Sequence, residues 1–324
     1  MHFAPLVAAA ICLVLLFVLV RSQSLPKDLP NDRSLHSAPV SRSGGLAMVF
    51  AIMFIGPFFI FGVGTWLSVA AVLALVSFAD DWRSLPSLLR LAAHLLAAVA
   101  LVYYQMPDLP LPLVALLVFA IVWSTNLYNF MDGSDGLAGG MTLIGFGVYA
   151  IAGWTGGNAN FAWFAVSISA TAVAFLLFNF HPARIFMGDV GSIPLGFLAA
   201  ALGVHGWYSG FWPAWFPLLT FSPFIVDATL TLAQRAARGE RFWQAHREHY
   251  YQRLVRMGLG HRNTALAEYV LMAAAGISAL LLLRAPAFAQ QLALAAWAAI
   301  YLVLAAMVNK KWASHVAGKQ DDSA

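Results

Sequence analysis

The chain has 324 residues, of which 61% are hydrophobic and only 10% charged, and its mean hydropathy is +0.77. Soluble domains carry about 25% charged residues, so this composition excludes a soluble globular protein and predicts a chain embedded in lipid. The net charge of +4 does not indicate nucleic-acid binding, because the basic residues lie in short segments between apolar runs. The single cysteine, Cys12, excludes an internal disulfide and a cysteine-based metal site.

Apolar runs of bilayer-spanning length follow one another along the whole chain. We expect about 11 spans, near residues 3–20, 44–62, 66–79, 88–105, 111–125, 137–153, 161–178, 191–207, 212–233, 264–283 and 288–308. The first run has no preceding Lys or Arg, which favours an uncleaved span over a signal peptide. We therefore predict an all-α polytopic membrane protein, with one transmembrane catalytic domain over residues 1–309 and a polar tail over 310–324.

The basic residues divide unevenly between the two ends of these spans. Alternate connections contain residues 21–43, 80–87, 126–136, 179–190 and 234–263. With the tail, and with Arg90 in the turn after the second connection, they hold all 18 Lys and Arg residues except Arg284. Because basic loops stay in the cytoplasm, we predict a multi-pass protein of a bacterial inner membrane with a periplasmic N-terminus and a cytoplasmic C-terminus. The clustered acids lie in the same connections, which predicts cytoplasmic catalytic loops.

The first acidic feature is the pair Asp80-Asp81 at the end of the third run. Adjacent carboxylates repel each other, so a divalent cation or a proton-transfer role would explain the pair. A solvated helix end followed by Arg83 is the alternative.

Two further segments combine acids, amides and glycines. Asn126, Asn129, Asp132 and Asp135 are spaced three residues apart, on one helical face or around one loop, and precede a glycine-rich helix start that favours anions. A capped turn is the alternative reading. In the segment 179–192, Asp189 stands between glycines, where it either caps the next helix or binds a metal. Beside it, Phe186 and Met187 are suited to stacking on a nucleobase or to contact with lipid.

The longest polar connection is strongly basic and contains two histidines. Its arginines could hold anionic lipid headgroups. His246 and His249 are three residues apart, and because the acids elsewhere favour a hard cation, contact with phosphate is the better interpretation than a metal pair. Asp227 lies within the ninth run near two prolines, where it either satisfies broken-helix backbone or is functional. The segment holding Asn31 and Arg33 faces the same compartment.

Together these segments resemble the polyprenyl-phosphate N-acetylhexosamine-1-phosphate transferase family, also called glycosyltransferase family 4. It includes bacterial lipid-carrier GlcNAc-1-phosphate transferases and the phospho-MurNAc-pentapeptide translocase. The resemblance runs in order from Asn31 to Arg253. Its most diagnostic motifs are Asp80-Asp81, Asn126-x-x-Asn129-Phe130-x-Asp132-Gly133-x-Asp135-Gly136 and Phe186-Met187-Gly188-Asp189-x-Gly191-Ser192. The histidine-rich C-terminal motif departs from the family, because it reads His249-Tyr250-Tyr251-Gln252-Arg253 here.

The resemblance implies a role for each matching residue. Asp189 and Asn129 match positions that coordinate Mg²⁺, for which Mn²⁺ is an alternative. Asp80 and Asp81 match the pair that deprotonates or positions the lipid phosphate, with Asp80 as the candidate general base. Asp132 and His249 complete the expected catalytic set. The expected substrate contacts are Asp135, Asn126, Asn179, the uracil-stacking Phe186, His246, Arg247, Arg253, Asn31 and Arg33.

The resemblance further implies the reaction and the partners. The enzyme would transfer N-acetylhexosamine 1-phosphate from a UDP-sugar to polyprenyl phosphate, releasing UMP, as the first membrane step of O-antigen or other surface polysaccharide synthesis. GlcNAc, GalNAc, QuiNAc, FucNAc and MurNAc-pentapeptide stay open as the sugar, with a peptidoglycan translocase as the alternative enzyme. A secondary transporter is the alternative of a different class, and a homodimer also stays open.

Overall fold

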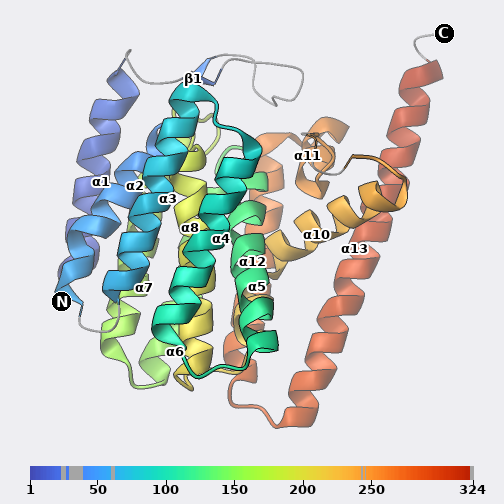
Figure 1. Ribbon diagram of the computed structural model, residues 1–324. Helices are drawn as coiled ribbons and strands as arrows, with labels where there is room; N and C mark the ends of the chain where they lie inside the picture. Colours follow the sequence, from blue (N-terminus) through green and yellow to red (C-terminus); the bar gives the residue numbers. More distant parts are fainter. Residues whose placement is uncertain (23–26, 29–38, 60–62, 242–243, 245, 322–324) are drawn as a thin grey trace.

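The computed structural model describes residues 1–22, 27–28, 39–59, 63–241, 244 and 246–321. Most of this chain forms long helices that run up and down through one bundle (Figure 1). The prediction of an all-α polytopic membrane protein is confirmed. The only strands in the described segments are β1 (Lys27–Asp28) and β2 (Val40–Ser41), which pair antiparallel.

The helical elements alternate in direction along the bundle. In chain order they are α1 (Ala4–Arg21), α2 (Gly44–Ile55), α3 (Val63–Arg83), α4 (Ser87–Gln105), α5 (Leu111–Phe130), α6 (Leu137–Thr155), α7 (Ala159–Asn179), α8 (Asp189–Tyr208), α9 (Trp215–Thr220), α10 (Ser222–Ala237), α11 (Tyr250–Leu254), α12 (Gly260–Leu282) and α13 (Ala287–Asp321). A 3-10 turn (Gly56–Phe58) follows α2, and a π-helical turn (Val255–Leu259) joins α11 to α12.

Within the described chain, nine helices are long and apolar enough to cross a membrane, two fewer than the eleven spans expected. The second expected span is short because α2 tightens into the 3-10 turn at Gly56-Pro57. The ninth expected span is two helices, α9 and α10, which meet at Phe221 just before Pro223. A proline fits the first turn of a helix but interrupts a continuous one. The α13 helix continues past residue 309 to Asp321, so the polar C-terminal segment begins as helix.

The bundle has a buried centre and an exposed edge. In α6, α7 and α8, 72%, 67% and 78% of the residues in the apolar window are buried, whereas the value for α13 is 6%. The last helix therefore lies at the margin of the bundle, as Figure 1 shows, with its side chains directed to the surroundings. An apolar surface of that kind is stable in contact with lipid.

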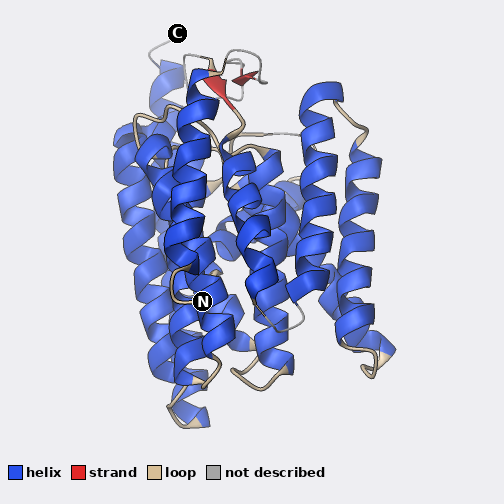
Figure 2. Cartoon of the chain, turned by 90° about the vertical axis from the view of Figure 1, so that its left-hand side faces the viewer, coloured by secondary structure: helices blue, strands red, loops and turns tan. Residues whose placement is uncertain are grey.

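The connections with the unusual polar residues meet at one end of the bundle. The turns after α3, α5 and α7 lie there with α11, beside the short β1–β2 pair (Figures 1 and 2). We call this end of the bundle, defined by residues 84–86, 131–136, 180–188 and 246–254, the loop end. The alternation of the helices therefore places the motif-bearing segments together, as the sequence predicts.

Candidate active site

The loop before α8 is held rigidly against the start of α2. The Phe186 N–H donates to the Ser41 carbonyl oxygen (2.8 Å), and the Gly44 and Gly45 N–H groups donate to the carbonyls of Phe186 and Met187 (2.9 Å each). A Cβ atom built on Gly45 would lie 2.3 Å from the Gly191 Cα, so only glycine permits this approach of the two backbones. These contacts fix the position of Asp189, the first residue of α8.

A hydrogen-bonded chain connects Asp189 to the end of α5. The Asn129 side chain makes a hydrogen bond to the Asp189 carboxylate. The Ser192 hydroxyl donates to the Asn129 Oδ1 atom (2.8 Å), which leaves the amide nitrogen of Asn129 for Asp189. In this arrangement Asn129 orients Asp189, and its role as a direct metal ligand stays a prediction.

Asp132 completes the same cluster from the loop after α5. Its carboxylate accepts a hydrogen bond from the Gly188 N–H. Burial, and then repulsion from Asp189, raise the pKa of Asp132 well above its ordinary value, against the opposing effect of Arg42. A nearby cation would relieve this repulsion and favour the ionised carboxylate.

The adjacent acids Asp80 and Asp81 have different surroundings. Asp80 forms an ion pair with Arg90 (3.2 Å) and accepts a hydrogen bond from the Leu85 N–H (2.6 Å), so it ties α3 to α4. The carboxylates of both Asp80 and Asp81 interact electrostatically with Asp189. Both acids therefore belong to the cluster with Asp132 and Asp189, and Asp80 is in addition paired with Arg90.

The donor set of this cluster suits a hard divalent cation. The cations that interact most strongly with the carboxylates of Asp81, Asp132 and Asp189 are Arg42 and Arg90, and Arg90 also pairs with Asp80. The described residues contain no group of three His, Cys, Asp or Glu side chains preformed around a metal position. Mg²⁺ typically keeps several waters and uses one or two carboxylates together with substrate phosphates. Asp189 and Asp132 therefore fit as the protein ligands of a cation that arrives with a diphosphate.

A second arrangement orients His249. The Asp227 carboxylate accepts hydrogen bonds from the His249 Nδ1 atom (3.1 Å) and from the N–H groups of Tyr250 (2.9 Å) and Tyr251 (3.0 Å). The Tyr251 hydroxyl donates to the Phe130 carbonyl (3.0 Å), and the His249 ring stacks on the Phe130 ring. Asp227 therefore positions His249 and begins α11, and the unbonded Nε2 side of the ring is available for a phosphate.

Two residues predicted to contact the nucleotide are used by the protein itself. Asn179 Oδ1 accepts from the Gly136 N–H and its Nδ2 donates to the Ile185 carbonyl, each at 2.9 Å. The Asp135 carboxylate accepts from His181 Nδ1 (2.6 Å) and from the Ala183 N–H (3.1 Å). Both side chains thus fasten the loop before α8 to the loop after α5.

The same contacts bring in two histidines that the sequence did not single out as site residues. The His181 and His261 rings are stacked 5.6 Å apart beside Asp135. His181 lies within the polar segment 179–192, so its position gave a signal. His261 gave none, because its partners are more than 120 residues away along the chain.

Replacing Asn179 should destabilise the loop end. Asn179→Ala removes two buried hydrogen bonds and leaves the Gly136 N–H and the Ile185 carbonyl unpaired, which should lower the free energy of unfolding by about 2–3 kcal/mol. Asn158→Ala is the matched control, because Asn158 makes one capping bond at the other end of α7 and its loss should remove about 1 kcal/mol. Equal thermal midpoints for the two variants would contradict the bridging role of Asn179.

Of the other predicted substrate contacts before residue 246, the structure describes Phe186 and Asn126. Phe186 is half-buried in the loop before α8, whereas its neighbour Met187 is fully buried and is not available to lipid or a nucleobase. Asn126 hydrogen-bonds His94 and the Val122 carbonyl. Asn31 and Arg33 lie outside the described residues.

The basic residues around α11 divide between its two sides. The His246 ring packs 4.9 Å from the His249 ring, near Arg235 and Glu240. Arg247, partly buried, lies between these two histidines in the chain. Arg253 instead turns toward α13, where its guanidinium donates to Asn309 Oδ1 (2.7 Å). The structure therefore does not bring Arg253 to the cluster where we predicted its contact with substrate.

His246 should make the protein sensitive to acid. Burial, and then the neighbouring His249 and Arg235, lower the pKa of His246 from 6.5 to about 4. Between these values the unfolded chain binds a proton that the folded chain does not, so stability is lost as the pH falls through this window. The thermal midpoint of His246→Gln should fall less than that of the wild type between pH 6.5 and 4. The control His2→Gln, in the exposed N-terminal turn, should follow the wild type; an unchanged slope in His246→Gln would contradict the assignment.

Known proteins match both the apolar bundle and the motif segments. The family described as glycosyl transferase family 4 matches residues 63–206. The chain is 28% identical, over 79% of its length, to the probable undecaprenyl-phosphate N-acetylglucosaminyl 1-phosphate transferase of Bacillus subtilis (strain 168), 76% of which is covered. It is 44% identical to the phospho-N-acetylmuramoyl-pentapeptide-transferase of Geobacillus sp. (strain WCH70), and 45% to that of Geobacillus thermodenitrificans (strain NG80-2), each over only 28% of both chains.

The fold and the site together define a class of protein. A polytopic helical bundle with carboxylates gathered at one end, similar to enzymes that transfer sugar phosphates, is a membrane-embedded transferase. Over residues 63–206 the chain is similar to glycosyl transferase family 4.

Proposed function

We propose that the protein transfers N-acetylhexosamine 1-phosphate from a UDP-sugar to undecaprenyl phosphate or a similar polyprenyl phosphate, releasing UMP. The observation that carries the proposal is the convergence of Asp81, Asp132 and Asp189 at the loop end of an apolar bundle. There a water-soluble nucleotide can meet a lipid phosphate. The activities of the relatives, which act on undecaprenyl phosphate or transfer phospho-N-acetylmuramoyl-pentapeptide, suggest the substrate class.

The proposed chemistry is a direct displacement. An oxygen of the lipid phosphate attacks the sugar-proximal phosphorus, the bond from that phosphorus to the UMP oxygen breaks, and UMP leaves. Bound Mg²⁺, held by Asp189 and Asp132, would supply positive charge against the diphosphate. Asp81 is better placed than Asp80 to orient the attacking phosphate, because Asp80 is paired with Arg90. A lipid phosphate is already largely anionic, so orientation matters more than proton removal.

His249 would contact a phosphate from the opposite side of the site. Its Nδ1 atom is held by Asp227 and its ring by Phe130, so the Nε2 atom has a fixed direction. His246 and Arg247 are adjacent candidates for the same contact. The resemblance suggests that Phe186 stacks on uracil, and the half-buried position of its ring is consistent with that role.

The branch of the family and the placement of the protein belong to the same proposal. One relative, matched over 79% of the chain, is a probable undecaprenyl-phosphate N-acetylglucosaminyl 1-phosphate transferase, whereas the pentapeptide transferases named above match over short segments. We therefore favour GlcNAc or a related HexNAc, and initiation of a surface polysaccharide such as O-antigen. The loop end would face the cytoplasm from the bacterial inner membrane, since the basic residues gather there. A homodimer stays a prediction.

A donor screen tests the proposal. Purified protein with undecaprenyl phosphate and Mg²⁺ is given UDP-GlcNAc, UDP-GalNAc, UDP-QuiNAc, UDP-FucNAc or UDP-MurNAc-pentapeptide, and UMP is measured. UMP release with a HexNAc donor, dependent on the lipid, is the expected result. Release only with the pentapeptide donor would make the chain a peptidoglycan translocase, and release with none would contradict the proposal. A labelled phospho-enzyme trapped from the UDP-sugar alone would replace the direct route with a two-step route.

A further inference from the structure

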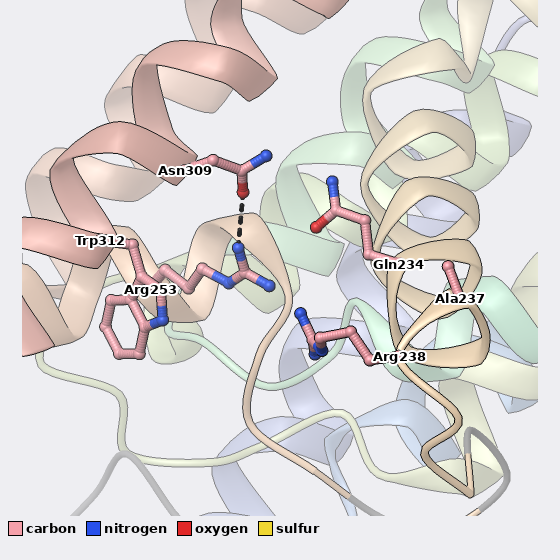
Figure 3. A pocket seen from close by; sticks show the side chains of 6 residues that line it. All are labelled: Gln234, Ala237, Arg238, Arg253, Asn309 and Trp312. Carbon is pink, nitrogen blue, oxygen red and sulfur yellow. Dashed lines mark hydrogen bonds between the residues drawn. The ribbon is translucent and has the colours of Figure 1, made fainter.

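A basic cavity lies on the side of α11 that faces away from the acidic cluster. It has a volume of about 440 Å³ and is lined by Gln234, Ala237, Arg238, Arg253, Asn309 and Trp312. Figure 3 shows that the guanidinium groups of Arg238 and Arg253 and the amides of Gln234 and Asn309 are directed toward a shared space between α10 and α13.

The α11 helix separates this cavity from the proposed active site. Tyr250 and Arg253, three residues apart, share the face toward α13, where both contact Asn309. His249 and Tyr251 contact Phe130 on the other side. The cavity is therefore distinct from the acidic cluster.

Arg253 is poorly satisfied for a buried cation. Its side chain is 3% exposed, its nearest acidic partner, Glu248, lies 3.8 Å away, and its Nε atom has no hydrogen-bond partner in the described structure. A buried guanidinium normally has its donors paired, because an unpaired charge in such a position is unfavourable. Arg253 thus points to an anion that completes its contacts.

The charges around the cavity leave a positive excess. Arg235 and Arg238 make the short ion pairs with the carboxylates of Glu240 and Glu248, and Arg253 reaches Glu248 only at 3.8 Å, so three cations face two anions. Arg256 adds another positive charge, since its guanidinium lies 4.7 Å from the centre of the Trp312 ring. Guanidinium groups bind phosphate oxygens in a bidentate fork.

The position of the cavity makes a lipid headgroup the accessible source of that anion. One wall is α13, whose apolar window is only 6% buried, so lipid can reach the cavity from the side. Trp312, with Lys310 and Lys311 beside it, has the composition of a helix end at the membrane–water interface.

We propose that this cavity binds the phosphate group of an anionic phospholipid, or free phosphate, through Arg238, Arg253 and the Asn309 amide. The bound phosphate would connect α13 to the outer face of α11. His249 directly precedes α11, and Tyr251 within α11 contacts Phe130, so occupancy also steadies one wall of the proposed active site.

Binding by the purified full chain tests the site. Native mass spectrometry with dioleoyl-phosphatidylglycerol, against dioleoyl-phosphatidylcholine, should show one preferred anionic lipid per chain. Arg238→Gln and Arg253→Gln should weaken it by about tenfold or more, because each removes a charge-assisted contact. Lys311→Gln, an exposed charge on α13 that does not line the cavity, should bind as the wild type does.

A second arm separates the two sources of phosphate. Inorganic phosphate is titrated while the thermal midpoint and the retained lipid are followed. Displacement of the lipid with a raised midpoint assigns the site to free phosphate, and retention of the lipid assigns it to the headgroup. Because Arg253 is buried, Arg253→Gln is expected to lower stability as well as lipid binding. Arg238 is exposed, so lipid binding by Arg238→Gln, whose folding is checked by its thermal midpoint in phosphatidylcholine, is the deciding result. Equal binding of both probes by the wild type and Arg238→Gln would overturn the proposal.

Discussion

Asp189→Asn is expected to reduce UMP release by about 100- to 1,000-fold while the protein still inserts into membranes and folds. The substitution keeps the shape and the hydrogen bond to Asn129 but removes the charge that a cation between Asp189 and the diphosphate requires. The measurement is UMP release from purified protein over a range of Mg²⁺ concentrations, with the thermal midpoint measured in parallel.

Asp108→Asn is the matched control, since Asp108 is an exposed acid in the loop between α4 and α5 at the other end of the bundle. It should turn over as the wild type does. If Asp189→Asn reached the wild-type rate at saturating Mg²⁺, Asp189 would not be a metal ligand. Asp132 would then be the remaining candidate ligand of the cation.

Asp227→Ala is expected to affect stability and activity together. It leaves two N–H groups and the His249 ring without their acceptor in a buried position, which should lower the free energy of unfolding by about 3 kcal/mol. Because His249 loses its orientation, UMP release should fall by about 10- to 100-fold. Thermal unfolding and steady-state kinetics measure the two effects.

Two comparisons separate positioning from general destabilisation. Asp227→Asn retains an oxygen acceptor and should recover much of the stability and part of the rate. Thr229 lies on the same helix as Asp227 and makes an exposed hydrogen bond with Trp123 of α5. Thr229→Ala should therefore change neither the stability nor the rate by a large amount. A variant Asp227→Ala that lost stability but kept the wild-type rate at low temperature would show that Asp227 is purely structural.

The helical bundle was predictable because it depends on composition and charge, which act segment by segment. Length, hydropathy and the placement of Lys and Arg determine which runs cross the bilayer and which connections share an end. The break between α9 and α10 at Phe221 was harder to predict. Pro223 signals an interruption, but only packing decides whether a span bends or becomes two helices.

The acidic cluster was predictable in its members and less so in their partners. Asp81, Asp132 and Asp189 stand in local motifs, so their residue type and spacing indicated chemistry. The division between Asp80 and Asp81 depends on Arg90, which lies on the next helix. A side chain's role in such a pair is set by tertiary contacts that no local pattern encodes.

The C-terminal motif illustrates the same limit. His249 and Arg253 lie four residues apart in one motif, yet their side chains have different partners, which are Asp227 for His249 and Asn309 for Arg253. Asp227, which lies on α10, accepts hydrogen bonds from His249 and from the first N–H groups of α11 and so directs His249. Asn309, on α13, accepts a hydrogen bond from Arg253. The resemblance to the family therefore predicted that Arg253 contacts the substrate, whereas the structure places Arg253 beside Asn309 and Trp312.

In the proposed reaction the bond broken lies between the two phosphorus centres of the UDP-sugar, and not between the sugar and its phosphate. Purified protein should be given undecaprenyl phosphate, Mg²⁺ and UDP-GlcNAc, or the preferred donor of the screen, labelled with ³²P in the sugar-proximal phosphate. The proposed reaction predicts that the label moves into the lipid fraction while unlabelled UMP appears in equal amount. Label that stays in solution as UDP, with unlabelled phosphate linking sugar to lipid, would contradict it.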